Sequence, residues 1–202
     1  LLELRLLLLD LRLERRQTLP VLSNVLVALE DNQLSLTGTD LEVEIVGRVT
    51  LEYAGESGEI TVPARKLVDI CRSLPEGAII DFIEEKQRII VKSGRSRFTL
   101  STLPATDFPN VKDGHSDLQF NCAQKEIKRL IDSTAFAMAQ QDVRYYLNGM
   151  SLETEENVIR TVATDGHRLA LCRLNYETAL PSRQVIIPRK GVLEISRLIS
   201  ED

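Results

Sequence analysis

The chain has 202 residues, of which 43% are hydrophobic and 27% are charged, and its formal net charge is −5. This composition is typical of a water-soluble globular protein, and the length suits one large domain or two small ones. It contains no run of 18 apolar residues and no recognisable secretory leader. The three cysteines form no CxxC pair, which favours a reducing cytoplasm: Cys71, Cys122 and Cys172.

The first third of the chain predicts a helix followed by strands. Residues 1–16 open with a leucine-rich stretch, for which we expect a helix. In residues 34–53 apolar side chains alternate with glutamates, as on a strand with one buried face. Leu41, Val43 and Ile45 are expected to share the buried face of that strand.

Two proline-led segments predict further helices. Residues 63–74 and 188–198 each begin with proline, which suits the first turn of a helix. Between them, residues 78–103 predict a hairpin and a further strand, followed by a loop rich in Pro, Asp and Gly. Residues 123–139 predict another helix, because apolar and small side chains recur there at helical spacing: Ile127, Leu130, Ile131 and Thr134.

The two halves of the chain repeat each other at one constant separation of about 125 residues, which is the size of a domain. We therefore expect an α+β fold with two copies of one domain, residues 1–117 and 118–202, each with two helices on antiparallel sheets. The second copy has no counterpart of residues 78–117, so we expect the natural protein to be longer. The matched pairs are Leu22 with Leu147, Thr39-Asp40 with Thr164-Asp165, Pro63 with Pro188, Asp69 with Glu194, Ile70 with Ile195 and Arg72 with Arg197.

Charge is segregated between the expected elements. The helical segments carry a positive net charge, whereas the rest of the chain is acidic. Basic helices facing DNA phosphates and an acidic exterior would fit this division. Charge alone favours the simpler interpretation that the basic helix faces are solvated.

Several ordered blocks resemble a known family. They are LPVLSNVL, LSLTGTDLE, ITVPARKLVDICRSLPEG, SGRSRFTLSTLPATDFPN, QQDVRYYLNGM, TVATDGHRLA and IPRKGV. Together they resemble the bacterial replicative sliding clamp, the beta subunit of DNA polymerase III, from about Arg15 to the last residue. The resemblance implies three clamp domains per full-length protomer, the third being absent here, and two protomers closed into a dimeric ring. The leucine-rich residues 1–13 depart from the family pattern.

The resemblance implies a non-catalytic processivity factor that encircles duplex DNA without reading its sequence. It would tether the replicative polymerase, the clamp loader and repair polymerases through short linear motifs, in the cytoplasm, with no cofactor, metal or membrane. Two alternatives stay open. One is a peptide-binding module that does not encircle DNA. The other is an enzyme, either one using Asp165 and His167 or a metal-dependent nuclease using paired acids such as Asp40 and Asp165, although no metal-ligand spacing supports it.

Three sets of site residues follow from the resemblance. The DNA-contacting set is Arg16, Gln141, Arg144, Tyr145 and Tyr146. An Arg-Tyr-Tyr run offers a cation and two aromatic faces, which suits a frayed or single strand, although packing of Tyr146 into the sheet is an equal alternative. The wall of a partner-peptide pocket is Leu147, Thr164, Gly166, His167, Arg168 and Leu169. The dimer interface is Lys66, Arg95, Arg97, Phe98 and Leu100, from which we expect strand addition across subunits, although arginines also guard soluble edge strands.

Overall fold

The structure is a computed structural model that describes residues 19–52, 55–109 and 118–199. Its internal contacts divide the chain into two compact units, Leu1–Lys112 and Asp113–Asp202. Among the described residues, no helix has the length and hydropathy that a bilayer crossing needs. The helix expected over residues 1–16 lies outside the described residues.

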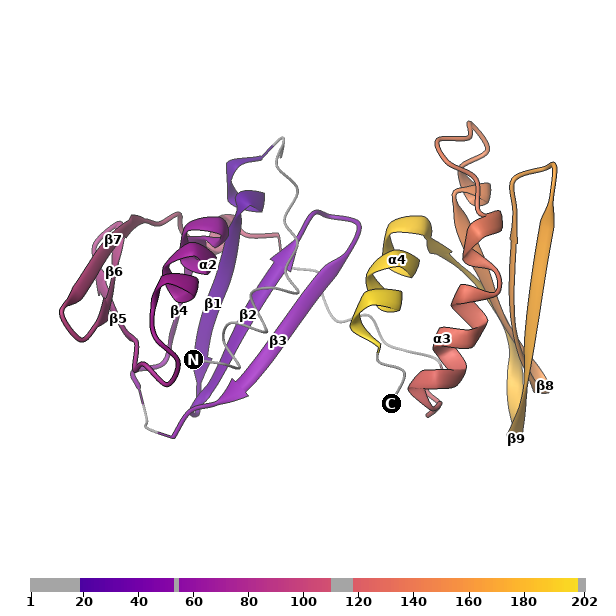
Figure 1. The fold of residues 1–202 in the computed structure, drawn as a ribbon, viewed down its shortest axis with the longest axis horizontal. Helices are drawn as coiled ribbons and strands as arrows, with labels where there is room; N and C mark the ends of the chain where they lie inside the picture. Colours follow the sequence, from indigo (N-terminus) through magenta and orange to yellow (C-terminus); the bar gives the residue numbers. More distant parts are fainter. Residues whose placement is uncertain (1–18, 53–54, 110–117, 200–202) are drawn as a thin grey trace. The chain divides into compact units, whose positions relative to one another are not determined.

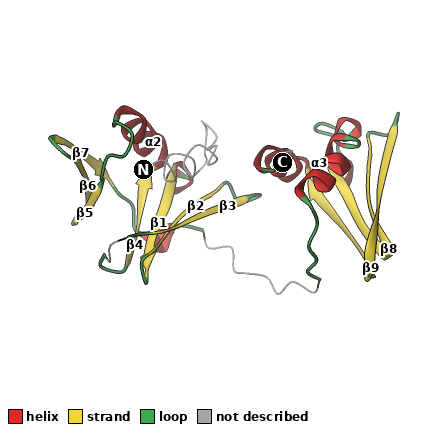
Figure 2. Cartoon of the chain, turned by 60° about the horizontal axis from the view of Figure 1, so that its bottom comes forward, coloured by secondary structure: helices red, strands yellow, loops and turns green. Residues whose placement is uncertain are grey.

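In the described part of the first unit, helix α2 packs on a four-stranded antiparallel sheet with the strand order β3-β2-β1-β4 (Figures 1 and 2). A second sheet, with the order β5-β6-β7, contains the predicted hairpin and further strand. Short 3-10 helices span Pro20–Ser23 and Ala105–Asp107. The other elements are β1 (Asn24–Glu30), β2 (Gln33–Thr39), β3 (Glu44–Thr50), β4 (Gly58–Pro63), α2 (Ala64–Ser73), β5 (Asp81–Glu85), β6 (Arg88–Ser93) and β7 (Ser96–Ser101).

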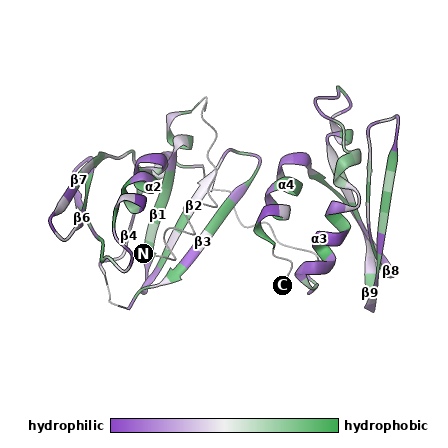
Figure 3. Ribbon diagram, in the orientation of Figure 1, coloured by the Kyte–Doolittle hydropathy of each residue, from purple (hydrophilic) through white to green (hydrophobic). Residues whose placement is uncertain are grey.

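The core of the first unit lies between α2 and the two sheets. Leu67 of α2 is fully buried, as are Val25 of β1 and Val62 of β4. Figure 3 shows that both apolar and hydrophilic residues recur along α2. This is the pattern of an amphipathic helix, whose apolar stripe faces the core. Burying this apolar stripe supplies the main driving force for packing the helix on the sheet.

One buried hydroxyl joins the two sheets of the first unit. Thr61 of β4 forms an isolated antiparallel bridge with Leu103, just after β7. Its Oγ1 donates to the Leu103 carbonyl at 2.8 Å and accepts the Leu103 N–H at 3.1 Å. The side-chain amide of Asn24 donates to the same oxygen at 2.9 Å. The hydroxyl therefore satisfies polar groups from two other chain segments.

The second unit packs two helices against a long antiparallel pair, β8 and β9 (Figure 1). Val192 of α4 and Ile131 of α3 belong to one buried cluster with Met150 of β8. The elements are α3 (Gln124–Asp132), 3-10 helices at Ala135–Ala137 and Tyr145–Leu147, β8 (Gly149–Thr164), β9 (Leu169–Pro188) and α4 (Arg189–Leu198).

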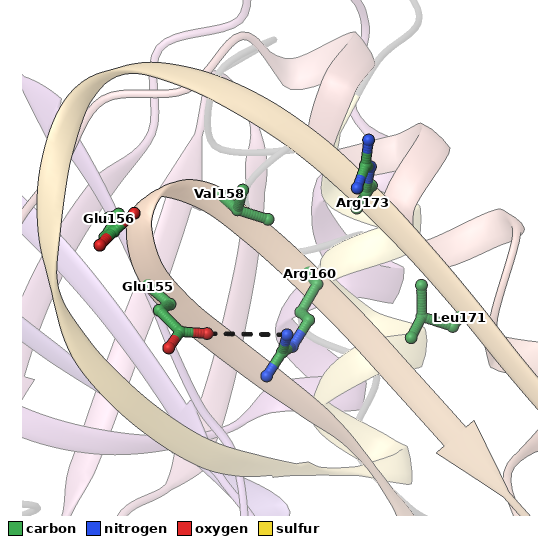
Figure 4. A pocket seen from close by; sticks show the side chains of 6 residues that line it. All are labelled: Glu155, Glu156, Val158, Arg160, Leu171 and Arg173. Carbon is green, nitrogen blue, oxygen red and sulfur yellow. Dashed lines mark ion pairs between the residues drawn. The ribbon is translucent and has the colours of Figure 1, made fainter.

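Strand register confirms the internal repeat. The β1–β4 pair Asn24↔Pro63 has its counterpart in Gly149↔Pro188, and the β2–β3 pair Thr39↔Glu44 has its counterpart in Thr164↔Leu169. Each residue of the two pairs in the second unit lies 125 residues after its counterpart in the first unit. The turn between β1 and β2 is also repeated, because Asp31 and Glu156 both have positive φ, 45° and 48°. The register of β8 against β9 shifts on either side of Glu156, where the ribbon of β8 turns back (Figure 4).

Two predictions about element boundaries are wrong. The strand expected through Leu41 is interrupted, because β2 ends at Thr39 and β3 begins at Glu44, with a tight turn between them. Leu41 has φ 77° and is 57% exposed, so it does not share a buried face with its neighbours. The helix expected to reach residue 139 ends at Asp132 and is followed by a 3-10 turn.

Candidate functional site

The turn that joins β8 to β9 is built by Thr164 and Asp165. The Thr164 hydroxyl donates to the Arg168 carbonyl at 2.7 Å and accepts the Gly166 N–H at 3.1 Å. Asp165 Oδ1 accepts the backbone N–H groups of His167 and Arg168, both at 3.0 Å. These N–H groups, with that of Arg168 first, hold the pKa of Asp165 below its usual value. Gly166 has φ 87°, a conformation that glycine adopts without steric cost.

The first unit contains the same turn. Asp40 Oδ1 accepts the N–H groups of Glu42 and Val43 at 3.0 and 2.9 Å, and the Thr39 hydroxyl donates to the Val43 carbonyl at 3.0 Å. Asp40 and Asp165 therefore have the same role, each as the acceptor that closes a turn in its own unit. The Asp165 carboxylate contacts His167 through the backbone N–H of the histidine. This contact does not support the hypothesis that the two side chains form a catalytic pair. Among the described residues no group of acidic, histidine or cysteine side chains could hold a metal ion.

A second loop, residues 141–148, is held from within by Asn148 and Asp142. The Asn148 amide donates to the Asp142 carbonyl at 2.8 Å and its Oδ1 accepts the Asp142 N–H at 2.9 Å. The Asp142 carboxylate in turn accepts the Arg144 N–H at 2.8 Å and two guanidinium N–H groups at 3.0 and 2.9 Å. These bonds, the guanidinium first, lower the pKa of Asp142 to about 2.

The candidate DNA residues of this loop are exposed. Gln141 has positive φ, 56°, and lies on the surface. Tyr145 is 82% exposed and Tyr146 is half exposed, and their rings meet edge to face with centroids 5.9 Å apart. The alternative in which Tyr146 packs into the sheet is not what the structure shows. Two aromatic faces beside Arg144 are chemically suited to stacking bases and pairing with phosphate.

The structure brings the candidate DNA loop and the candidate peptide turn together. The Arg144 guanidinium lies against Gly166, so closely that a Cβ at this glycine would approach Arg144 Nη2 to 3.1 Å. The loop is also tied to α4, because the N–H of Arg189 donates to the Asn148 carbonyl at 2.9 Å. Arg144, predicted from the sequence with the DNA-contacting residues, therefore borders the peptide turn as well.

Three residues of this region were missed from the sequence. Asp142 and Asn148 fix the loop, and the signal for Asp142 was an acid two residues before Arg144. Phe136 is 59% exposed and lies under Arg168, whose guanidinium carbon is 5.6 Å from the ring centroid. Arg168 also pairs with Asp165 at 3.0 Å, so the exposed ring and the carboxylate position this guanidinium together.

The remaining predicted pocket residues frame this turn. Leu147 is half-buried, and its carbonyl accepts the N–H of Ala139 at 3.0 Å. Leu169 is 65% exposed at the start of β9, and the side chain of His167 is also exposed. The arrangement combines exposed apolar groups with a fixed cation, which suits an anchored peptide. Arg16, assigned to DNA contact, lies outside the described residues.

The predicted dimer-interface residues follow β7 and α2 in the first unit. β7 pairs with β6 on one side and lies at the edge of its sheet. Arg95, Arg97 and Lys66 are exposed, whereas Phe98 is half-buried against the core and Leu100 is inside it. The edge of β7 therefore offers backbone groups and basic side chains to a partner. Leu100 holds β7 in place by packing into the core.

A repeated α+β domain, with the same strand register and the same Thr-Asp turn in both units, defines a class of multidomain protein built from copies of one fold. The family model for the DNA polymerase III beta subunit N-terminal domain matches residues 9–112, and that for its central domain matches residues 121–202. The chain belongs to the DNA polymerase III beta subunit family.

Named relatives agree with this assignment. The chain is 66% identical to the beta sliding clamp of Pseudomonas aeruginosa over 93% of its length and 59% identical to that of Escherichia coli over 91%. It spans about half the length of these relatives, 52% and 50%. A crystal structure of the Pseudomonas aeruginosa subunit superposes with a TM-score of 0.95 at 61% identity, covering 98% of this chain and 55% of that one. A Caulobacter crescentus subunit gives 0.88 at 40% identity, covering 98% and 55%.

Proposed function

We propose that the full-length protein is a DNA sliding clamp, a non-catalytic processivity factor that encircles duplex DNA as a dimeric ring. The observation that carries this proposal is the 66% identity to a beta sliding clamp over nearly the whole chain. The repeated domains support it, because a ring can be built from copies of one unit joined head to tail. A protein of this kind acts in the cytoplasm, where the bacterial chromosome lies.

DNA contact is assigned to the exposed loop with Gln141, Arg144, Tyr145 and Tyr146, together with Arg16. A clamp must hold DNA without reading its sequence, and phosphate contacts and base stacking both meet that requirement. Encirclement prevents sideways escape, so these contacts can stay weak enough for the ring to slide.

Partner tethering is assigned to the turn at Thr164–Leu169 with Leu147 and Arg144. The replicative polymerase, the clamp loader and repair polymerases would bind here through short linear motifs, and a tethered polymerase meets the primer end at high effective concentration. A related clamp from Pseudomonas aeruginosa was solved bound to griselimycin. Another, from Caulobacter crescentus, was solved with PEG bound to a putative beta-motif tethering region.

Ring closure is assigned to the β7 edge with Lys66, Arg95, Arg97 and Phe98. Unpaired backbone groups on an edge strand can continue a sheet into a partner subunit, and exposed arginines favour an acidic counterpart.

The test is retention of the full-length protein on DNA of two topologies. The protein is loaded onto nicked circular DNA by its clamp loader, separated from free protein, and released by cutting the circle once. We expect stable retention on the circle and rapid loss after linearisation. Equal loss from both forms with intact peptide binding would favour the peptide-binding module. Cleavage of the circle that depends on a divalent metal would favour the nuclease.

A further inference from the structure

An exposed apolar stripe continues from the candidate peptide turn along β9. Leu169 and Leu171 are alternate residues of one strand, so their side chains lie on the same face of the sheet. They are 65% and 56% exposed, whereas Ala170 between them is buried on the opposite face. Val162 of β8 pairs directly with Leu171 and widens the stripe.

The stripe leads into a groove of about 390 Å³ on the same face (Figure 4). Leu171 forms part of the wall, so the stripe and the groove are continuous. The groove is lined by Glu155, Glu156, Val158, Arg160, Leu171 and Arg173.

The charges in the groove leave one cation without a carboxylate. Arg160 pairs with Glu153 and, at 3.8 Å, with Glu155. Arg173 lies directly opposite Arg160 in the strand register. Among the described residues, Arg173 has no ion-pair partner, and like charges opposite each other destabilise a strand pair. A bound carboxylate would relieve this repulsion.

The spacing along β9 fits an extended peptide. Leu169 and Arg173 are four residues apart, which corresponds to roughly 13 Å of strand. An extended peptide with its apolar side chains on the turn would therefore reach Arg173 about four residues further along. Glu155 and Glu156 line the other end of the groove and would repel a second acid placed beyond that point.

We propose that the partner-binding site extends along Leu169 and Leu171 to Arg173, where it selects partner segments with an acidic residue about four positions from their apolar anchor. This inference rests on the proposed function of the turn as a peptide-binding site. The occupant is an extended, acidic-flanked segment of a partner protein, and Arg173 is the residue that determines this preference.

The experiment uses the full-length protein and six fluorescein-labelled synthetic peptides. Each has an apolar anchor of two leucines and a four-residue spacer that ends in Glu, Gln or Lys, and each of these three sequences is made in both chain directions. Fluorescence anisotropy gives the Kd of each peptide. The variants are Arg173→Gln, Leu169→Ser and, as a matched control, Arg88→Gln, an exposed arginine of β6 in the other unit.

We expect the Glu peptide to bind about three- to fivefold more tightly than the Gln peptide, and the Lys peptide to bind more weakly. Arg173→Gln should remove the Glu preference, Arg88→Gln should keep it, and raising the salt concentration should reduce it. If Leu169→Ser weakens all peptides while the Glu preference is absent or survives Arg173→Gln, the extension is wrong and the proposed peptide site stands. If no peptide binds the wild-type protein detectably, or if binding is indifferent to Leu169→Ser, both the turn as a peptide site and this extension are wrong.

Discussion

Leu41 and Gly166 occupy the same position of the same turn, one in each unit, and both have positive φ, 77° and 87°. In each turn the N–H of this residue donates to the hydroxyl of the threonine two positions earlier, at 3.1 Å. The two turns therefore share one backbone geometry, although the side chain at this position differs between them. In the second copy the glycine also lets the Arg144 guanidinium approach.

Opposite substitutions at this shared position should have opposite effects on stability. Gly166→Ala should lower the free energy of unfolding by about 1–2 kcal/mol, because the left-handed conformation penalises a Cβ and Arg144 must shift. Leu41→Gly should be neutral or stabilising by up to about 1 kcal/mol, since the relief of strain exceeds the entropy that glycine loses on folding. Urea unfolding of both variants measures this. A destabilisation by Leu41→Gly as large as that by Gly166→Ala would contradict the shared geometry.

This turn also shows where sequence patterns were sufficient and where they were not. The Thr-Asp pairs and the proline-led helices marked the repeat correctly, because hydrogen-bonding and backbone requirements recur with the residues themselves. The alternation through Leu41 predicted a continuous strand, because period-two spacing does not distinguish a strand from two strands joined by a tight turn. The Asp40 side chain decides between them by capping the N–H groups of Glu42 and Val43.

α3 ends at Asp132 because a buried hydrogen-bond network follows it, and this network supports a second prediction. The Thr134 hydroxyl lies 2.7 Å from the Leu130 carbonyl and 3.2 Å from the Thr161 hydroxyl, which itself donates to Leu130 at 3.0 Å. Both threonines are buried. Thr134→Val should cost about 1–3 kcal/mol, because it leaves buried acceptors short of a donor. Ser133→Ala, at an exposed neighbour, is the control in the same urea titration, and equal effects would argue against the network.

The hydrogen bonds of the Thr61 hydroxyl, which join the two sheets of the first unit, support a third prediction. Thr61→Val keeps the volume of the side chain but removes the oxygen that serves Asn24 and both backbone groups of Leu103. We expect a loss of about 1–3 kcal/mol, with faster amide exchange around Leu103 than in β1. Thr37→Val, on a half-buried position of β2, controls for the loss of a threonine hydroxyl. Unchanged exchange at Leu103 would show that the sheets are joined by other contacts.

Acid should loosen the loop at residues 141–148 only at low pH. The pKa of Asp142 is lowered from 3.8 to about 2, chiefly by the Arg144 guanidinium. A carboxylate with a lowered pKa stabilises the folded state above its unfolded pKa, and this contribution is lost as the pH falls from about 4 through about 2. Carboxyl chemical shifts followed by NMR should give a midpoint near 2 for Asp142. Arg144→Gln should move that midpoint up toward 3.8, and a midpoint already near 3.8 in the wild type would contradict the pairing.

The site itself was predictable in composition but not in arrangement. The resemblance supplied Arg144, Tyr145 and the residues of the turn, yet it assigned Arg144 to DNA contact alone. Only the fold shows that this guanidinium is held by Asp142 and rests on Gly166. Phe136 gave no signal, because an exposed aromatic is recognised only when the cation above it is known. Contacts between residues distant in sequence depend on packing, which no local pattern encodes.

The last prediction concerns the β7 edge. Arg97 is exposed on this strand, whose outer side has no strand neighbour among the described residues of its sheet. In the full-length protein, Arg97→Glu should place an acid where we propose a cation facing an acidic partner edge, and like charges across an interface cost several kcal/mol. Analytical ultracentrifugation should therefore show a dimer for the wild type and a monomer at micromolar concentration for the variant. Arg88→Glu on β6 is the matched control and should stay dimeric. If Arg97→Glu remained as dimeric as this control, the ring would close through another surface.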